Sequence, residues 1–297
     1  TVALRSHNAY TRMALELPWR ARARGAQVMH VQYTRPLWAP CPYVISIHDL
    51  VGLHLPESLP RATRWRLRHF TGTSARGAAG IFVLTRAIQA EIMEAYGIAG
   101  ERFHLVQPAL DRTRFRPCAT PDALEAVRAR YGLPAEYVLY LGLLHPRKNV
   151  GRLARVMARL PQHGHDLPLV VAGPRAWLVD AVLREVEDAG LGARLHFTGY
   201  VDDADLPLLY AGARVFAYLS RYEGFGIPAV EALACGAPVL AADIPVLREA
   251  TLEQAAYVDP LDDDAVLHGL LALLEDGEAP ARARAASTML GERYTAA

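Results

Sequence analysis

The apolar residues of this chain gather in short runs, and longer segments of mixed residues separate these runs. Short apolar runs of this kind are typical of strands that are buried on both faces of a parallel sheet. The segments between them carry apolar positions at helical spacing, for example over residues 86–96, 149–160 and 178–189. The alternation predicts an α/β fold made of two Rossmann-like domains with doubly wound parallel sheets. We predict strands at residues 28–33, 43–47, 81–84, 103–106, 137–141, 169–172, 195–198, 215–219, 239–242 and 256–258.

Residues 107–121 interrupt this alternation, because they are rich in Pro, Asp, Arg and Thr and show no periodicity. We interpret this stretch as a linker and the 297 residues as two domains of ordinary size, residues 1–116 and 117–297. The first 27 residues read as a loop and a basic helix over residues 12–24.

Composition excludes several classes of protein. The net charge of +1 gives no strong attraction to nucleic acid, so no nucleic-acid partner is expected. The three cysteines show no C-x-x-C spacing, which argues against a disulfide framework or a zinc site and suits a reducing cytoplasm. No apolar run reaches the roughly 18 residues that a membrane-spanning helix needs. We therefore expect a cytoplasmic protein.

The most informative stretch is Glu223-Gly-Phe-Gly-Ile-Pro-Ala-Val-Glu231, where two carboxylates lie on either side of a glycine-rich turn. Gly224 and Gly226 let the backbone approach a ligand closely, and Pro228 suits the first turn of a helix. The free amides at such a helix start favour an anion such as a diphosphate, whereas carboxylates suit hydroxyl groups. An anion between two sets of hydroxyls describes a nucleotide sugar. The plainer alternative is a structural turn whose glutamates complement the helix dipole.

Lysine usage points to a second position. Lys148 is the single lysine among 32 basic residues, so the other 31 are arginine. It lies in Gly142-Leu-Leu-His-Pro-Arg-Lys-Asn-Val150, directly after a predicted strand, and ligands bind at the carboxyl ends of strands in open α/β sheets. A compact ammonium at such a place can hold a phosphate. The alternative is an ordinary exposed lysine at a helix start.

Both stretches resemble motifs of one family. Residues 220–239 resemble the signature of retaining glycosyltransferases of family 4, with Leu219 in place of the usual proline and Leu233 in place of methionine. Residues 142–150 resemble the G-x-x-x-P-R-K-N segment of the same family, and the two matches occur in the expected order. The resemblance implies the two-domain GT-B fold. It also implies metal-independent transfer of a hexose, with mannose favoured, from a nucleoside-diphosphate sugar to a glycan or lipid-linked acceptor, with no cofactor.

The resemblance also implies a role for each matching residue. Arg147 and Lys148 would neutralise the charge that grows on the departing diphosphate. Glu223 would hold sugar hydroxyls and Glu231 would hold ribose hydroxyls. The loop at residues 199–203 resembles the family's G-x-V-x-D-x-x-L loop, whose backbone contacts the nucleotide base. The residues expected to line the donor site are Gly142, Gly173, Val201, Gly224, Phe225, Gly226, Ile227 and Glu231. The acidic residues expected to cap the helix after residue 205 are Asp202, Asp203 and Asp205.

His48 is the candidate from the first domain. It follows a predicted strand, where a lone histidine is more often structural. However, Ile47-His-Asp-Leu50, followed by Pro56 and Glu57, resembles the first-domain motif of the same family, where the histidine approaches the donor sugar. We therefore expect His48 in the site and Asp49 as a helix cap or loop anchor, since the two side chains point opposite ways on extended backbone.

Two features leave alternatives open. Family members begin with a strand and a glycine-rich loop that the first 27 residues do not contain, so we expect a shortened first domain. Non-catalytic binding of a nucleotide sugar, or another enzyme on the same fold such as a sugar-nucleotide epimerase or a glycan phosphorylase, therefore stays open. The basic stretch Arg61–Phe70 is either a solvated helix or a contact with anionic lipid on the inner face of the membrane.

Overall fold

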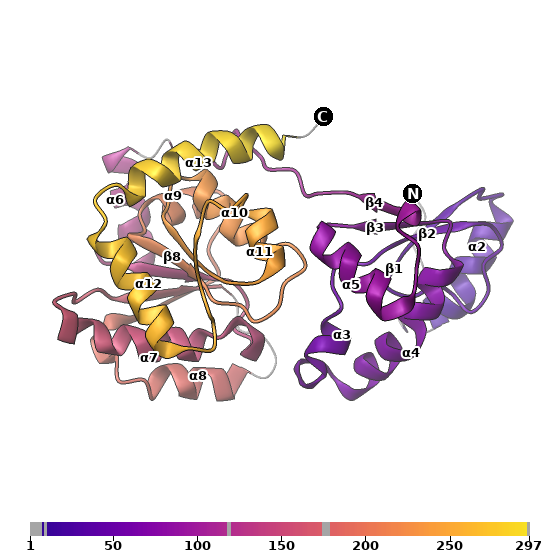
Figure 1. The fold of residues 1–297 in the computed structure, drawn as a ribbon, viewed down its shortest axis with the longest axis horizontal. Helices are drawn as coiled ribbons and strands as arrows, with labels where there is room; N and C mark the ends of the chain where they lie inside the picture. The colour runs from indigo at the N-terminus through magenta and orange to yellow at the C-terminus, as the bar shows by residue number, and fades with distance from the viewer. Residues whose placement is uncertain (1–7, 9–10, 118–119, 174–178, 296–297) are drawn as a thin grey trace. The chain divides into compact units, whose positions relative to one another are not determined.

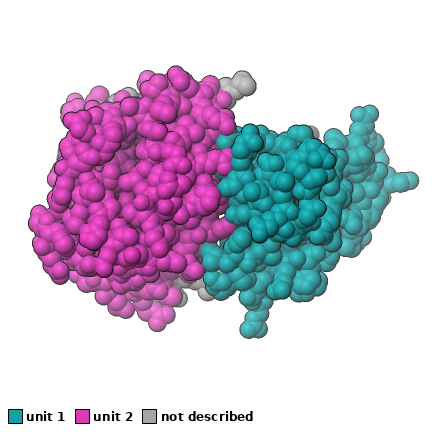
Figure 2. All heavy atoms as spheres, viewed as in Figure 1, with its two compact units in different colours: residues 1–107 teal, residues 108–297 magenta. Residues whose placement is uncertain are grey.

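The computed structural model describes residues 8, 11–117, 120–173 and 179–295 and divides into two compact units, Thr1–Gln107 and Pro108–Ala297 (Figure 1, Figure 2). The sequence prediction placed the boundary after residue 116. The structure places it at the start of the linker stretch, because that stretch packs within unit 2. Leu110 N–H donates to the carbonyl of Tyr294 at 2.7 Å, and the ring of Phe115 lies 6.4 Å from the ring of Tyr210.

Unit 1 contains a four-stranded parallel sheet with the strands in sequential order. The strands are β1 (Met29–Gln32), β2 (Tyr43–Ser46), β3 (Gly80–Val83) and β4 (Phe103–Leu105). The helices are η1 (Arg12–Glu16), α2 (Leu17–Ala23), α3 (Val51–His54), η2 (Pro56–Ser58), α4 (Arg61–Gly77), α5 (Arg86–Tyr96) and η3 (Gly100–Arg102).

Local signals explain why α5 matches the predicted helix over residues 86–96. The hydroxyl of Thr85 accepts the N–H of Ile88, which satisfies one of the free amides at the helix start. Gly97 takes a φ of 63° and ends the helix in the left-handed conformation that glycine adopts without strain. Ile88 and Ile92 lie one helical turn apart and are fully buried, so one face of the helix packs on the core.

Unit 2 contains a six-stranded parallel sheet in the order β10-β9-β8-β5-β6-β7. The strands are β5 (Val138–Leu141), β6 (Leu169–Ala172), β7 (Leu195–Gly199), β8 (Val215–Tyr218), β9 (Val239–Ala242) and β10 (Ala256–Val258). The helices are α6 (Pro121–Tyr131), η4 (Pro146–Lys148), α7 (Val150–Arg159), η5 (Leu160–His163), α8 (Val179–Glu187), η6 (Gly192–Arg194), α9 (Leu206–Ala211), α10 (Ile227–Ala234), α11 (Pro245–Ala250), α12 (Asp263–Glu275) and α13 (Ala279–Arg293).

Helices cover both faces of this sheet. In Figure 1, α7, α8 and α12 lie on one side, and α9, α10 and α13 lie on the other. The central strands β6, β8 and β9 are buried along their whole length, as expected for apolar runs between two helical layers. The doubly wound architecture predicted from the sequence is therefore confirmed for unit 2.

The strand order reverses between β5 and β8. From β5 the chain moves outward through β6 and β7, and then returns to β8 on the other side of β5 before it continues to β9 and β10. The carboxyl ends of β5 and β8 are therefore neighbours, although their loops are far apart in sequence. In open α/β sheets this reversal point is where ligands bind.

The predicted elements correspond closely to the observed ones. Each predicted strand overlaps an observed strand, with ends that differ by at most one residue. The helix predicted over residues 149–160 is α7, and the one predicted over residues 178–189 contains α8, whose predicted first residue lies outside the described residues. The basic helix predicted over residues 12–24 is formed by η1 and α2.

Candidate functional site

Two loops meet at the reversal point of unit 2. The loop after β5 contains the turn η4, and the loop after β8 leads into α10. The N–H of Arg221 donates to the carbonyl of Arg147 at 2.8 Å, and the guanidinium of Arg147 donates to the carbonyl of Tyr222 at 2.7 Å. These bonds join the two motifs found in the sequence into one surface.

Local backbone chemistry places the basic residues at this edge. The imidazole of His145 accepts the N–H of Arg147, which holds the start of the turn. Asn149 then takes a φ of 62°, a left-handed conformation that asparagine tolerates better than most residues, and α7 begins directly after it. The turn therefore directs Lys148 into the protein.

The centre of the site is a cluster of two cations around one carboxylate. Lys148 Nζ lies 2.5 Å from Glu223 Oε1, and Arg147 Nη1 lies 3.1 Å from the same oxygen. The residues Lys148 and Glu223 are only 9% and 7% exposed. The cluster therefore carries a net charge of +1 at a place where little water screens it.

The pKa values of Lys148 and Glu223 are both lowered, for different reasons. Burial lowers the pKa of Lys148 and Glu223 opposes that shift, while Arg147 adds to it. Burial alone would raise the pKa of Glu223, but the two cations outweigh it and hold the pKa of the carboxyl below its ordinary value. A buried site that holds one carboxylate against two cations is suited to receive an anion.

Glycines at the ends of β5 and β6 allow the backbones to approach closely. Gly142 N–H donates to the carbonyl of Ala172 at 2.9 Å, and Gly173 N–H donates to the carbonyl of Gly199 at 2.8 Å. Gly173 has a φ of 129°, and a Cβ atom there would lie 2.3 Å from the carbonyl oxygen of Gly142. Gly142 and Gly173 therefore lie side by side at the sheet edge.

The glycine-rich turn before α10 is equally tight. Gly226 has a φ of 98°, and a Cβ atom there would lie 2.4 Å from the side chain of Leu247. The ring of Phe225 is buried, with its centroid 5.4 Å from that of Tyr294, whereas Ile227 is exposed. The backbone of Gly224 to Gly226 and the side chain of Ile227 are therefore the parts of this turn best placed to meet a ligand from solvent.

Glu231 lies on α10 beside a separate cavity of about 290 Å³. The hydroxyl of Tyr210 donates to Glu231 Oε2 at 3.0 Å. Burial raises the pKa of Glu231 to about 7, against the lowering effects of the Tyr210 hydrogen bond and of Arg114. The cavity also contains Phe225 and Ile227. The structure thus brings Arg147, Lys148 and Glu223 together and places Glu231 in a cavity beside the same turn.

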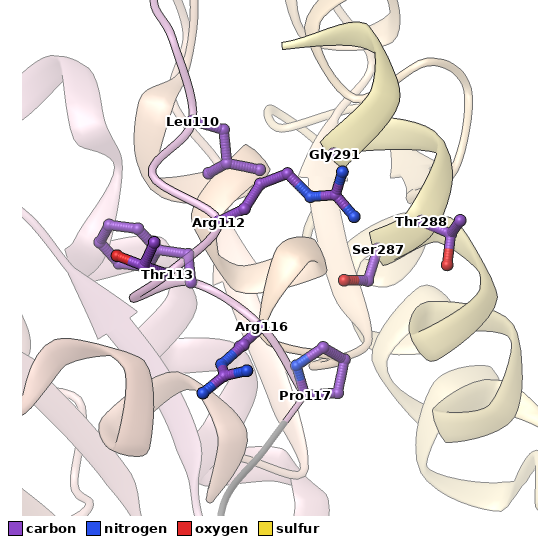
Figure 3. A pocket seen from close by; sticks show the side chains of 9 residues that line it. Leu110, Arg112, Thr113, Arg116, Pro117, Ser287, Thr288 and Gly291 are labelled. Atoms are coloured by element: carbon purple, nitrogen blue, oxygen red, sulfur yellow. The ribbon is translucent and has the colours of Figure 1, made fainter. Parts of the chain in front are cut away.

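A larger cavity of about 640 Å³ lies between the linker stretch and α13 (Figure 3). It shares Leu110 and Phe115 with the Glu231 cavity, so this stretch of chain separates the two. Figure 3 shows the side chain of Arg112 extended beside Gly291 of α13. The residues expected in the donor site lie elsewhere, and the sequence reasoning did not anticipate this cavity.

The loop after β7 corrects one expectation. Val201 is buried there, but the capping role expected of Asp202, Asp203 and Asp205 is wrong, because α9 begins without a side-chain cap. The carboxylate of Asp205 instead accepts hydrogen bonds from Arg130 at 2.7 Å and from Tyr131 at 2.8 Å. The Asp205 carboxylate therefore pairs with donors on α6, of which the charged Arg130 is the stronger, and does not cap the start of α9.

His48 belongs to unit 1, two residues after the end of β2. Its ring lies edge-on to the ring of Tyr33, with 5.9 Å between centroids, and its buried Nδ1 has no hydrogen-bond partner among the described residues. The carboxylate of Asp49 accepts the N–H of Val51 at 3.1 Å at the start of α3, so its role as a loop anchor is confirmed.

Sequence reasoning missed several polar side chains at these sites. Tyr218 ends β8 and accepts a hydrogen bond from Lys148 Nζ at 2.7 Å. Tyr210 bonds Glu231, and the Arg114 guanidinium donates to the carbonyl of Asp203 at 2.5 Å. A tyrosine at the end of an otherwise apolar strand was the available signal for Tyr218, because a buried hydroxyl needs a polar partner.

The described residues contain neither a metal-binding cluster nor a membrane-spanning helix. Within residues 8, 11–117, 120–173 and 179–295, no group of three or more His, Cys, Asp or Glu side chains is placed to hold a metal ion. In the same part of the chain, none of the helices has both the length and the apolar character needed to span a bilayer.

Two regions of the chain match known protein families. Residues 126–288 match the family described as glycosyl transferases group 1, and residues 2–114 match the family described as glycosyltransferase family 4. O-antigen chain mannosyltransferase B of Escherichia coli is 31% identical over 235 residues, which cover 78% of this chain and 61% of the relative. Mannosylfructose-phosphate synthase of Agrobacterium fabrum is 30% identical over 192 residues, covering 61% of this chain and 42% of the relative. The chain thus spans less than two thirds of the length of these relatives.

Solved structures share the fold. The Anabaena protein HepE, crystallised with UDP and glucose, has a TM-score of 0.76 at 20% identity and covers 98% of this chain and 80% of its own. WaaG, a glycosyltransferase involved in lipopolysaccharide biosynthesis, has a TM-score of 0.71 at 20% identity, covering 99% and 81% of the two chains. The group 1 match spans more than half of the chain and contains both sequence motifs. The predicted membership and the GT-B fold are therefore confirmed, and this chain belongs to the glycosyl transferases group 1 of the family 4 glycosyltransferases.

Proposed function

We propose that this chain is a retaining hexosyltransferase that moves a hexose, mannose in the first instance, from a nucleoside-diphosphate sugar to a glycan or lipid-linked acceptor. One observation carries the proposal: the buried cluster of Arg147, Lys148 and Glu223, with its net positive charge, lies at the reversal point of the sheet. The mannosyltransferase name of the Escherichia coli relative supports the sugar, and the UDP and glucose bound by HepE support a nucleotide-sugar donor.

The cluster can stabilise the charge that develops as the donor breaks. The acceptor oxygen forms a bond to the anomeric carbon while the bond from that carbon to the diphosphate oxygen breaks. The acceptor proton passes to the departing phosphate on the same face of the sugar, so the configuration is retained. Arg147 and Lys148 would neutralise the diphosphate, in a position that is already organised by Glu223.

The other donor-site residues follow from this placement. The amides of Gly224 to Ile227 at the start of α10 would face the diphosphate, and Glu223 would accept bonds from sugar hydroxyls. Glu231, with Tyr210, would hold the ribose. Gly142, Gly173 and Val201 would form the backbone wall, with Val201 toward the base. His48 would approach the sugar from unit 1.

We also propose that the chain works at the inner face of the cytoplasmic membrane through Arg61–Phe70. These residues form the first turns of α4, where Trp65 and Phe70 are 57% and 40% exposed and their ring centroids lie 5.5 Å apart. Exposed aromatic rings among arginines suit contact with anionic lipid, which would bring the chain near a lipid-linked acceptor.

The deciding experiment incubates the chain with GDP-mannose, UDP-glucose and related donors, with and without polysaccharide or lipid-linked oligosaccharide acceptors. The expected result is release of nucleoside diphosphate that depends on acceptor, together with a product whose anomeric configuration matches the donor by NMR. Inverted product would contradict the retaining reaction. Donor binding without release would indicate a non-catalytic binding module, and conversion of the donor sugar without release would indicate an epimerase.

A further inference from the structure

Tyr218 contacts the site ammonium in two ways. It is the last residue of β8, it is 1% exposed, and its hydroxyl accepts a hydrogen bond from Lys148 Nζ at 2.7 Å. Lys148 Nζ also lies 4.7 Å from the centroid of the Tyr218 ring. Because β8 is the direct neighbour of β5, this side chain comes from the strand that the reversal of order places against the lysine loop.

The tyrosine hydroxyl connects both charges of the pair. It accepts from Lys148 and is hydrogen-bonded to the Glu223 carboxylate. An ammonium has three N–H donors. Glu223 and Tyr218 take two of them, which, among the described residues, leaves one N–H of Lys148 available to an anion.

We propose that Tyr218 is a positioning residue, which together with Glu223 fixes the direction of the Lys148 ammonium toward the donor diphosphate. The role of Tyr218 in catalysis rests on the proposed function, whereas its hydrogen bond with Lys148 is a property of the folded chain. A flexible lysine held at two points loses less freedom when it binds a phosphate, because its rotamer is already selected.

The buried ammonium of Lys148 needs polar partners to stay protonated. Burial lowers the pKa of Lys148, and the neighbouring Arg147 acts in the same direction, so the ammonium depends on Glu223 and on polar contacts to stay protonated. Burial, with the nearby charge of Glu223, raises the pKa of Tyr218 well above its ordinary value. The Tyr218 hydroxyl therefore stays neutral over the working pH range and keeps both of its hydrogen bonds. Tyr140, Arg147 and Tyr210 also interact electrostatically with Tyr218.

The single lysine of the chain allows a direct test. Protein labelled with ¹³Cε-lysine gives one lysine resonance, that of Lys148, whose titration reports the pKa of the ammonium without any substrate. Tyr218→Phe removes the hydroxyl and keeps the ring. Because one hydrogen bond to a charged group is worth about tenfold or more in an equilibrium constant, we expect the Lys148 pKa to fall by about 1 or more in this variant.

Tyr137→Phe is the matched control. It also removes a buried tyrosine hydroxyl, one that donates to the carbonyl of Leu209 at 2.8 Å away from the cluster. We expect an unchanged Lys148 titration in Tyr137→Phe. In transfer assays, Tyr218→Phe should lower kcat and kcat/KM by the same factor of about ten, since the lost contact acts on the departing group.

The measurements separate the two proposals. An unchanged Lys148 pKa in Tyr218→Phe overturns the positioning role, whether or not the chain transfers sugar. A lowered pKa supports it even where no transfer is found, and that second result would count only against the proposed function. If Tyr218→Phe does not fold, the wild-type spectrum decides. A Lys148 ¹Hε signal displaced from its random-coil position by the Tyr218 ring supports the contact, and a random-coil position rejects it.

Discussion

Lys148 and Glu223 are 75 residues apart in sequence, yet the ammonium of one lies 2.5 Å from the carboxylate of the other inside unit 2. The reversal of strand order between β5 and β8 makes this contact, because it places the loops that follow these strands side by side. A buried ion pair of this kind contributes little to net stability, since the cost of removing both groups from water offsets their attraction. Its value is in holding two charged groups in fixed positions at a ligand site.

Replacing either member of the pair should abolish most of the activity. We expect Lys148→Ala and Glu223→Ala each to lower turnover by on the order of 10²-fold or more, as the loss of an electrostatic group in a transition state does. Steady-state transfer assays measure this. Near-normal rates in both variants would refute the assignment of the site.

The two variants should differ in stability. Glu223→Ala leaves the Arg147 and Lys148 cations without their carboxylate, so we expect it to lower the free energy of unfolding by about 3–5 kcal/mol. Lys148→Ala leaves Arg147 to pair with Glu223 and should cost about 1–2 kcal/mol. Glu136→Ala, which breaks an exposed 3.0 Å pair with Arg214, is the control and should stay within about 0.5 kcal/mol. Urea denaturation compares the three.

Gly173 should tolerate no side chain. A Cβ atom at this position would lie 2.3 Å from the Gly142 carbonyl oxygen, a backbone atom that cannot turn aside as a flexible side chain can. The φ of 129° at Gly173 would also strain any other residue. We expect Gly173→Ala to destabilise unit 2 by about 3 kcal/mol or more. Gly132→Ala tests the backbone term alone, because Gly132 has a φ of 62° and open space around it, and should cost about 1 kcal/mol. Equal losses in the two variants would show that the contact with Gly142 is not tight.

The positions of the strands could be predicted from the sequence because the apolar runs are too short for buried helices and too apolar for surface loops. The order of the strands could not be predicted from the sequence. The contact between Lys148 and Glu223 depends on that order, and the 75-residue separation between them contains no local signal for it. The contact of Tyr218 could not be predicted for the same reason, because its partner Lys148 lies in the loop after β5, a different strand. The same reason applies to Asp205, where local rules favoured a helix cap and Arg130, 75 residues earlier, takes the carboxylate.

The spacing of the two glutamates predicts that both lie beside one turn, but not which partner each side chain contacts. Eight positions suggested one pocket with a carboxylate at each end. The structure pairs Glu223 with Lys148, whereas α10 directs Glu231 toward Tyr210 and the cavity beside the linker stretch. The direction of a side chain on a helix depends on the packing of that helix, which the sequence pattern of nine residues does not specify.

The titration of Glu231 should appear in the stability of the protein. Burial raises its pKa from 4.5 to about 7, so the folded state binds the proton more tightly than the unfolded state. This contribution to stability is complete below about pH 4.5 and is lost as the pH rises through 7. With about 1.4 kcal/mol for each pH unit between the two pKa values, wild type should lose roughly 3 kcal/mol relative to Glu231→Gln over this window. Urea denaturation at pH 5 and pH 8 measures the difference.

A second variant checks the cause. Tyr210→Phe removes the hydrogen bond that opposes the shift, so the pH at which stability is lost should move upward.

If Glu231 holds ribose hydroxyls, donor affinity should rise as the pH passes through 7, because the ionised carboxylate accepts more hydrogen bonds. Isothermal titration with nucleoside diphosphate across this range would show it. A flat profile in wild type would count against a ribose role for Glu231.

Binding to lipid through α4 should depend on both charge and aromatic side chains. We expect the chain to sediment with phosphatidylglycerol vesicles and not with phosphatidylcholine vesicles, and to be released by 0.5 M salt, since each basic residue near an anionic surface contributes about 1 kcal/mol. Trp65→Ala with Phe70→Ala should reduce sedimentation about tenfold or more, because both exposed rings are lost. Tyr200→Ala, which removes an aromatic ring that is 65% exposed on unit 2, should leave it unchanged. Equal sedimentation with the two kinds of vesicle, or with neither, would leave α4 as a solvated basic helix.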